Sequence, residues 1–104
     1  MSEPAYIPAA SVADLPPGAK KAVTLNGQEV LLCHNGERVF AVSNICSHAE
    51  ERLECGRMRG GWIACPIHGA RFDLETGEAM NPPATLPIKT YPVRIAGDTI
   101  EIAI

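Results

Sequence analysis

Two short cysteine–histidine pairs constrain this chain more than any other feature. One residue separates Cys46 from His48, two separate Cys65 from His68, and sixteen lie between His48 and Cys65. Spacing this short places each pair on one tight loop. Two such loops facing each other offer two thiolates and two imidazoles, which are common metal ligands. The sequence therefore predicts a four-ligand metal site, with the rest of the chain as the frame that holds the two loops.

The size and composition predict one globular domain. The chain has 104 residues, of which 46% are hydrophobic, so it can form a modest core that a metal site would help to hold. Nine glycines and nine prolines favour short strands and turns over long helices. The net charge of −3 argues against a protein that binds nucleic acid or an anionic membrane surface.

The amino-terminal residues show no export signal. Met1–Pro4 contains no basic region followed by an apolar run, so we expect neither a signal peptide nor a transmembrane helix. Four cysteines without an export signal, two of them spaced with histidine, favour metal ligation over disulfides. We therefore expect a cytoplasmic monomer.

The first half of the chain predicts an antiparallel meander. Three stretches rich in strand-forming residues, 20–25, 28–34 and 38–42, are joined by Asn26-Gly27 and Asn35-Gly36. Asn-Gly between two such stretches is the strongest short signal for a β-hairpin, because both residues accept the left-handed backbone of the turn.

Further strands are expected at both ends of the chain. Residues 5–9 indicate a short edge strand, and Ser11 is suited to cap a single helical turn that follows. Strands are also expected over 87–95 and 99–104, joined by a turn at Gly97-Asp98. The first and last strands must then pair or pack together across the middle of the chain.

Between residues 44 and 84 the strand pattern stops, and glycine and proline surround the two cysteine–histidine pairs. We therefore predict one domain over 1–104, with a base formed by 1–43 and 85–104 and a cluster-binding lobe over 44–84. The fold class is all-β: an antiparallel β-sandwich or partly open barrel with an inserted loop-rich lobe. Only two short strand pieces are expected within the lobe, at about 61–64 and 71–73.

The arrangement of the ligands bears on which metal is bound. Structural zinc typically takes two cysteines from one arm and two histidines from the other. Here each arm carries one of each, which suits a Rieske [2Fe–2S] centre, where two histidines replace two cysteines on one iron. Cys46 and Cys65 would bind one iron, and His48 and His68 would bind the other. A zinc-stabilised binding module is the alternative.

The sequence resembles the Rieske family. Cys46–His48 and Cys65–Gly69 resemble its two boxes, Cys-x-His and Cys-Pro-x-His-Gly, separated by about sixteen residues. The stretches Phe72–Gly77, Asn81–Pro83 and 86–104 are similar to the continuation found in soluble Rieske ferredoxins. The resemblance covers most of the chain and implies one Rieske [2Fe–2S] cluster per chain.

The resemblance also implies a function. In the family's dioxygenase systems, a soluble ferredoxin passes single electrons from a flavin-dependent NAD(P)H reductase to a terminal ring-hydroxylating oxygenase with its own Rieske centre. An alternative is the small Rieske-like subunit of an assimilatory nitrite reductase, although those chains often depart from the ligand pattern. An enzyme is not expected, because the three histidines leave only His34 for a mononuclear iron site and no Gly-x-Gly-x-x-Gly motif is present.

Two residues near the second box bear on the reduction potential. In high-potential relatives, as the resemblance implies, a serine follows His-Gly and a disulfide ties the two loops. This chain has Ala70 and Ile67 at the corresponding positions. We expect a potential near the low end of the Rieske range, about −150 mV. Pro82 and Pro83 are expected to cover the cluster and keep water away.

The remaining candidates are expected to be structural. Cys33 is predicted in the core, His34 exposed, Cys55 packed, and Trp62 as a core anchor beneath the lobe. Three acids beside the first box form either a docking rim or a solvated face. They are Glu50, Glu51 and Glu54.

Overall fold

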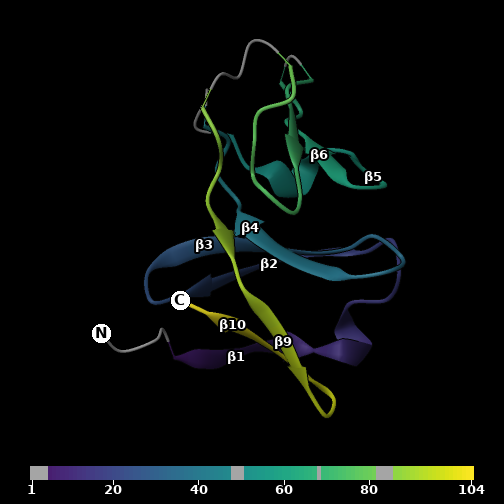
Figure 1. The fold of residues 1–104 in the computed structure, drawn as a ribbon, viewed down its shortest axis with the longest axis vertical. Coiled ribbons are helices and arrows are strands. Elements are labelled where there is room, and N and C mark those ends of the chain that lie inside the picture. Colours follow the sequence, from purple (N-terminus) through teal and green to yellow (C-terminus); the bar gives the residue numbers. More distant parts are fainter. Residues whose placement is uncertain (1–4, 48–50, 68, 82–85) are drawn as a thin grey trace.

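The computed structural model describes residues 5–47, 51–67, 69–81 and 86–104. These residues form three antiparallel sheets (Figure 1). The first has the order β1 (Tyr6–Ser11), β10 (Thr99–Ala103), β9 (Val93–Ala96). The second has the order β2 (Lys20–Leu25), β3 (Gln28–His34), β4 (Val39–Ser43), β8 (Thr90–Tyr91). The third has the order β5 (Met58–Arg59), β6 (Trp62–Ala64), β7 (Arg71–Asp73). Two single-turn 3-10 helices accompany them in the described ranges: η1 (Val12–Asp14) and η2 (Leu53–Cys55). The predicted all-β class is confirmed.

The predicted meander is confirmed as β2, β3 and β4. Strands β2 and β3 pair from Lys20↔Cys33 to Leu25↔Gln28, so Asn26 and Gly27 alone form the turn. Both residues have positive φ, 50° and 76°, as a tight hairpin requires. The local turn chemistry therefore sets the register of this sheet.

The two ends of the chain pair as expected. Strand β1 runs antiparallel to β10, from Tyr6↔Ala103 to Ser11↔Thr99, and the register shifts between Pro8 and Ala10. Proline lacks the N–H that a continuous ladder needs, which accounts for an irregularity at this edge. The Ser11 hydroxyl accepts a hydrogen bond from the Ala13 N–H at 3.3 Å, which confirms the predicted cap.

The strand structure expected over 87–95 is present but shorter, and it is divided in two. The structure has two strands there, separated by Pro92: β8 pairs with β4, whereas β9 pairs with β10 in the other sheet. Proline cannot donate to a ladder, so the chain changes sheets at this residue. This crossing joins the first and second sheets, as Figure 1 shows.

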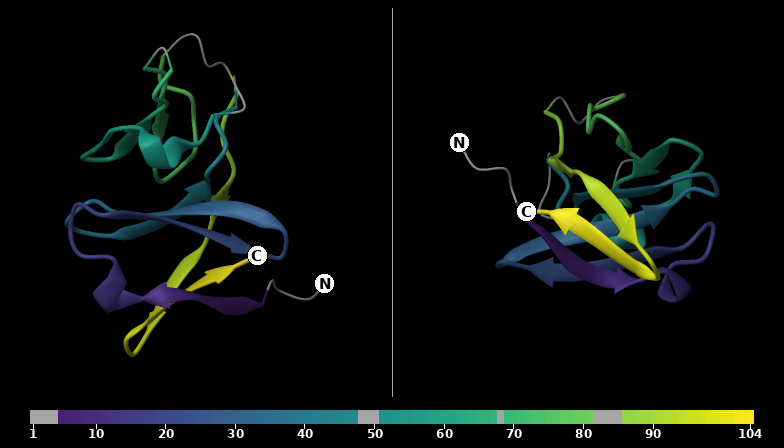
Figure 2. Two further views of the ribbon diagram at one scale, coloured as in Figure 1. Left: turned by 180° about the vertical axis from the view of Figure 1, so that it is seen from behind. Right: turned by 60° about the horizontal axis from the view of Figure 1, so that its bottom comes forward.

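The sheets stack in three layers, with the second sheet in the middle (Figures 1 and 2). On β3, Val30 and Leu32 pack against the first sheet, whereas Leu31 and Cys33 pack against the lobe. All four side chains are fully buried. Because successive side chains point to opposite faces, a strand between two cores is apolar throughout. The lobe therefore packs on one face of the central sheet.

The lobe core differs from the prediction at one aromatic residue. Trp62 is only half-buried, and the Arg71 guanidinium lies 5.2 Å from the centre of its ring. The neighbouring Ile63 and its cross-strand partner Phe72 are fully buried instead. On a strand, side chains alternate between faces, so burying Ile63 turns Trp62 toward solvent.

A substitution of Gly56, which directly follows η2, tests how tightly the lobe is packed. It is buried, and a Cβ there would overlap the carbonyl oxygen of Ala64. We expect Gly56→Ala to lower the free energy of unfolding by roughly 1–3 kcal/mol in urea titrations. Gly61→Ala is the matched control, because a Cβ there meets nothing within 4 Å. Equal effects of the two substitutions would contradict the packing described for Gly56.

Candidate metal centre

The first ligand loop leaves the end of β4 and closes on itself. The Cys46 N–H donates to the Glu51 carbonyl at 2.9 Å, and Ile45 and Arg52 form a β-bridge just below it. The loop that they close carries Cys46 at its start. His48, predicted as a ligand in the same loop, lies outside the described residues.

The second ligand loop connects β6 to β7. The Cys65 N–H donates to the Ala70 carbonyl at 2.7 Å, and Gly69 has a φ of 68°. Few residues other than glycine adopt this left-handed backbone, so Gly69 is needed to close the turn. His68, the other predicted ligand of this loop, lies outside the described residues.

The structure brings Cys46 and Cys65 together. Both are buried, 3% and 1% exposed, and both belong to one hydrophobic cluster. Burial raises the pKa of the Cys65 thiol, a hydrogen bond from the Ile67 N–H opposes this rise, and the neighbouring Cys46 thiol adds to it. Residues far apart in the sequence thus place two sulfurs at one point in an apolar core.

This pair fits the thiolate side of an iron–sulfur cluster. Bound metal keeps coordinating thiols deprotonated, which removes the unfavourable effect of burial on the charged form. Backbone N–H groups directed at cluster sulfurs are among the groups that set the reduction potential, and Ile67 provides one at Cys65. In the described ranges, no three His, Cys, Asp or Glu residues come together as a metal site.

A third segment touches both ligand loops. The Asn81 Oδ1 accepts from the Arg71 N–H at 2.7 Å, and its Nδ2 donates to the Gly69 carbonyl at 3.4 Å. The Ser47 hydroxyl donates to the Leu86 carbonyl at 2.6 Å. Residues on both sides of the Pro82-Pro83 pair therefore contact the loops. The prolines themselves lie outside the described residues, so their predicted cover of the cluster stays a prediction.

The other two cysteines differ from each other. Cys33 is fully buried in β3 as predicted, and burial raises the pKa of its thiol to about 12, with the nearby Lys20 ammonium opposing. The predicted packing of Cys55 is wrong: it is exposed on η2, where Leu53 turns into the core instead. Neither residue lies in a ligand loop.

His34 and the acids near the first box also have specific places. His34 is half-buried rather than exposed, with Nδ1 2.9 Å from the Leu15 carbonyl oxygen. Glu54 is exposed, as a solvated face requires, and its carboxylate also accepts from Asn44 Nδ2 at 3.0 Å. The sequence analysis did not single out Asn44 as a functional candidate. Its position as a single amide residue between the apolar end of β4 and the first box could have indicated it. Glu50 lies outside the described residues.

Comparison with known proteins identifies the family. The profile of the Rieske [2Fe-2S] domain matches residues 5–92. The chain belongs to the Rieske [2Fe–2S] family. The cofactor is therefore a Rieske-type cluster, which exchanges one electron when bound, and the zinc alternative is wrong.

Close relatives of this Rieske protein are ferredoxin components. The chain is 38% identical over 97 residues to the ferredoxin component of the naphthalene 1,2-dioxygenase system of Pseudomonas aeruginosa, with 93% of each chain covered. It superposes with a TM-score of 0.89 on the ferredoxin of carbazole 1,9a-dioxygenase from Nocardioides aromaticivorans IC177, at 37% identity and 94% and 96% coverage.

Two further structures bear on its partners. A chain in the complex of reduced oxygenase and oxidized ferredoxin in carbazole 1,9a-dioxygenase matches with a TM-score of 0.88, 25% identity, and 94% and 92% coverage. A nitrite reductase small subunit matches with a TM-score of 0.80 over 96% and 99% of the two chains, but at 20% identity. That likeness shows the shared fold alone.

The four cysteines provide a direct test of the thiolate assignment. We expect Cys46→Ser and Cys65→Ser each to abolish cluster assembly, because each removes a sulfur from the paired site. Cys33→Ala and Cys55→Ser should retain about two irons and two sulfides per chain, as a [2Fe–2S] protein requires. Iron and acid-labile sulfide analysis of the purified variants measures this. Full iron content in either of the first two variants would contradict the assignment.

Proposed function

We propose that this protein is a Rieske ferredoxin that carries single electrons from a flavin-dependent NAD(P)H reductase to the terminal oxygenase of an aromatic-ring dioxygenase system. The observation that carries the proposal is the pair of buried cysteines, Cys46 and Cys65, which two separate loops bring into one cluster. His48 and His68 are proposed to complete the ligand set. The similarity to ferredoxin components over nearly the whole chain supports the same function.

The residues of this chain hold the cluster and shield one side of it. Cys46 and Cys65 share a core with Leu53, Ile63 and Phe72, all of them buried, so the thiolate side is closed to water. We infer that electrons are exchanged through a side of the cluster that faces away from this core. The sequence has too few histidines for a separate catalytic iron, so the chain transfers electrons and does not act on the aromatic substrate itself.

We propose a cytoplasmic monomer that meets each partner in turn. No helix among the described residues is long and apolar enough to cross a membrane. The carbazole dioxygenase complex contains both an oxygenase and a ferredoxin, and the oxygenase is proposed as one partner here. The reductase is proposed as the other, because an electron carrier needs a donor. No observation favours a nitrite reductase subunit.

We propose that an apolar surface beside the ligand loops meets these partners. It consists of three exposed side chains: Ile67, Met80 and Leu86. Ile67 lies in the second ligand loop, the Met80 N–H donates to the Arg71 carbonyl, and the Leu86 carbonyl accepts from Ser47. All three are thus positioned by the segments that surround the predicted ligands. Exposed apolar groups around a functional centre are typical of a docking site.

Electron transfer with isolated partners tests the function. The holoprotein should be reduced by NAD(P)H only when the flavin reductase is added. Its cluster should then be reoxidised by the terminal oxygenase, which stopped-flow absorbance follows. A holoprotein that no such reductase reduces, but that is required for nitrite reduction, would overturn the proposal in favour of the nitrite reductase alternative.

Leu86 tests the docking surface. Its side chain is 63% exposed, and Ile95 on β9, in the layer farthest from the lobe, is a matched control at 52% (Figure 1). We expect Leu86→Ser to raise the KM of the oxygenase for this ferredoxin about five-fold, because an apolar contact buried in the complex is lost. Ile95→Ser should leave KM unchanged, and neither variant should change the reduction potential. Equal KM values for the two variants would contradict the proposed surface.

A further inference from the structure

Asn44 stands out because it is polar and completely buried. It follows β4 directly and is the one buried polar or charged residue in the described ranges, at 0% exposed. Its backbone joins two parts of the molecule: the N–H donates to the Glu29 carbonyl of β3 at 3.0 Å, and the carbonyl accepts from the Leu53 N–H of η2 at 2.7 Å. Asn44 therefore lies where the central sheet meets the first ligand loop.

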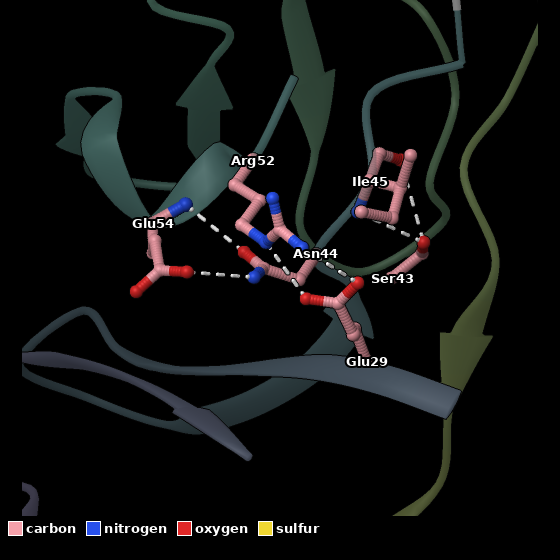
Figure 3. Close-up of polar contacts among 6 residues, drawn as sticks. All are labelled: Glu29, Ser43, Asn44, Ile45, Arg52 and Glu54. Carbon is pink, nitrogen blue, oxygen red and sulfur yellow. Dashed lines mark hydrogen bonds and ion pairs between the residues drawn. The ribbon is translucent and has the colours of Figure 1, made fainter. Parts of the chain in front are cut away.

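The Asn44 side chain holds a single residue on the other side of that junction. Its Oδ1 accepts from the Glu54 backbone N–H at 3.0 Å, and its Nδ2 donates to Glu54 Oε1 at 3.0 Å (Figure 3). Both polar ends of the amide are therefore satisfied. A buried amide left unpaired is costly, so an alternative position of η2 that breaks these bonds is disfavoured.

The helix that Asn44 contacts has no capping bond from its own N-cap side chain. The residue at that position, Arg52, makes no side-chain cap hydrogen bond, and Asn44 Oδ1 provides an acceptor for an η2 N–H instead. At the other end, Lys20 Nζ of β2 donates to the carbonyls of Glu54, at 3.1 Å, and Gly56. Asn44, directly after β4, and Lys20, in β2, therefore hydrogen-bond to the two ends of η2.

A surface ion pair lies beside this junction but contributes less to its stability. Arg52 donates to the Glu29 carboxylate at 2.8 and 3.3 Å, as Figure 3 shows. Both side chains are substantially exposed, and exposed pairs contribute little. The buried amide is the more specific restraint.

The restrained segment closes the first ligand loop. Glu51, just before η2, accepts the Cys46 N–H, and Leu53 of η2 packs in the same buried cluster as Cys46 and Cys65. A shift of η2 relative to the central sheet would therefore move the base of the loop and the packing around both sulfurs.

We propose that Asn44 and Glu54 form a junction lock that positions the first ligand loop against the second. Asn44 acts here as a positioning residue that works through η2. The lock holds Cys46 at the place where Cys65 completes the thiolate pair. This inference rests on the Rieske cluster but not on the identity of the electron donor or acceptor.

Exchanging the donor and acceptor roles of the two side chains tests the lock. Asn44→Asp keeps an acceptor for the Glu54 N–H but places a second carboxylate against the Glu54 carboxylate. We expect the holoprotein to lose its cluster to an iron chelator about ten-fold faster at neutral pH, followed by visible absorbance. Adding Glu54→Gln supplies a donor amide on the other side, so the double variant should return to within about two-fold of the original rate. The EPR spectrum of the reduced cluster should change in the single variant and recover in the double variant.

Asn35→Asp is the matched control, because Asn35 Oδ1 accepts two backbone N–H bonds in a hairpin turn of the base. It should leave both readouts unchanged. The lock is overturned if Asn44→Asp changes neither readout, or if Glu54→Gln fails to restore them. If Asn44→Asp cannot be purified with a cluster, Glu54→Ala, which removes the acceptor of the Asn44 Nδ2 bond, is compared with Glu75→Ala at an exposed site of the lobe. Faster cluster loss in Glu54→Ala alone supports the lock, and equal rates overturn it.

These measurements need no partner protein. A failure of electron transfer to an oxygenase with the lock intact would count against the proposed function only. Conversely, an unchanged cluster in the lock variants would count against the lock while the proposed function stands.

Discussion

The contact between Cys46 and Cys65 is the interaction on which the rest of the structure depends. Each cysteine starts a short loop closed by a backbone hydrogen bond, and both sulfurs enter one buried cluster. As metal ligands both thiols would be deprotonated, and a bound cation would offset the cost of burying that charge. The sheets, the turns and the junction at Asn44 can be understood as the support for this one contact.

The support comes mainly from the central sheet. Strand β3 presents Val30 and Leu32 to the first sheet and Leu31 and Cys33 to the lobe, so one strand belongs to both cores. Dense packing on both faces leaves little freedom for the lobe to shift as a layer. Polar contacts add to this packing at the edge, where β4 passes into the first ligand loop and Asn44 contacts η2, and where Lys20 of β2 donates to the Glu54 and Gly56 carbonyls.

The errors of the sequence-based predictions have a common physical origin. Asn-Gly turns and alternating strands depend on neighbours in the chain, and the β2–β4 meander was predicted correctly. The places of Trp62 and Cys55 and the division of the strand over 87–95 were not, because they depend on which partner lies across the sheet or the core. Pro92 divided a strand that its sequence pattern presented as continuous, and each half paired with a different sheet.

The sequence by itself determined the kind of centre this protein carries. The residue types and spacing of the two boxes are local properties, and together with the resemblance to the Rieske family they favoured a Rieske cluster over zinc before any contact was known. The sequence also predicted that Cys46 and Cys65 share one site and that Cys33 is structural. Only the tertiary structure decided that Cys55 and Trp62 lie outside the core and how the ligand loops are held. These outcomes depend on contacts that no spacing prescribes, such as those of Asn44 with Glu54. No local pattern contains such contacts, because they form only when the whole core is packed.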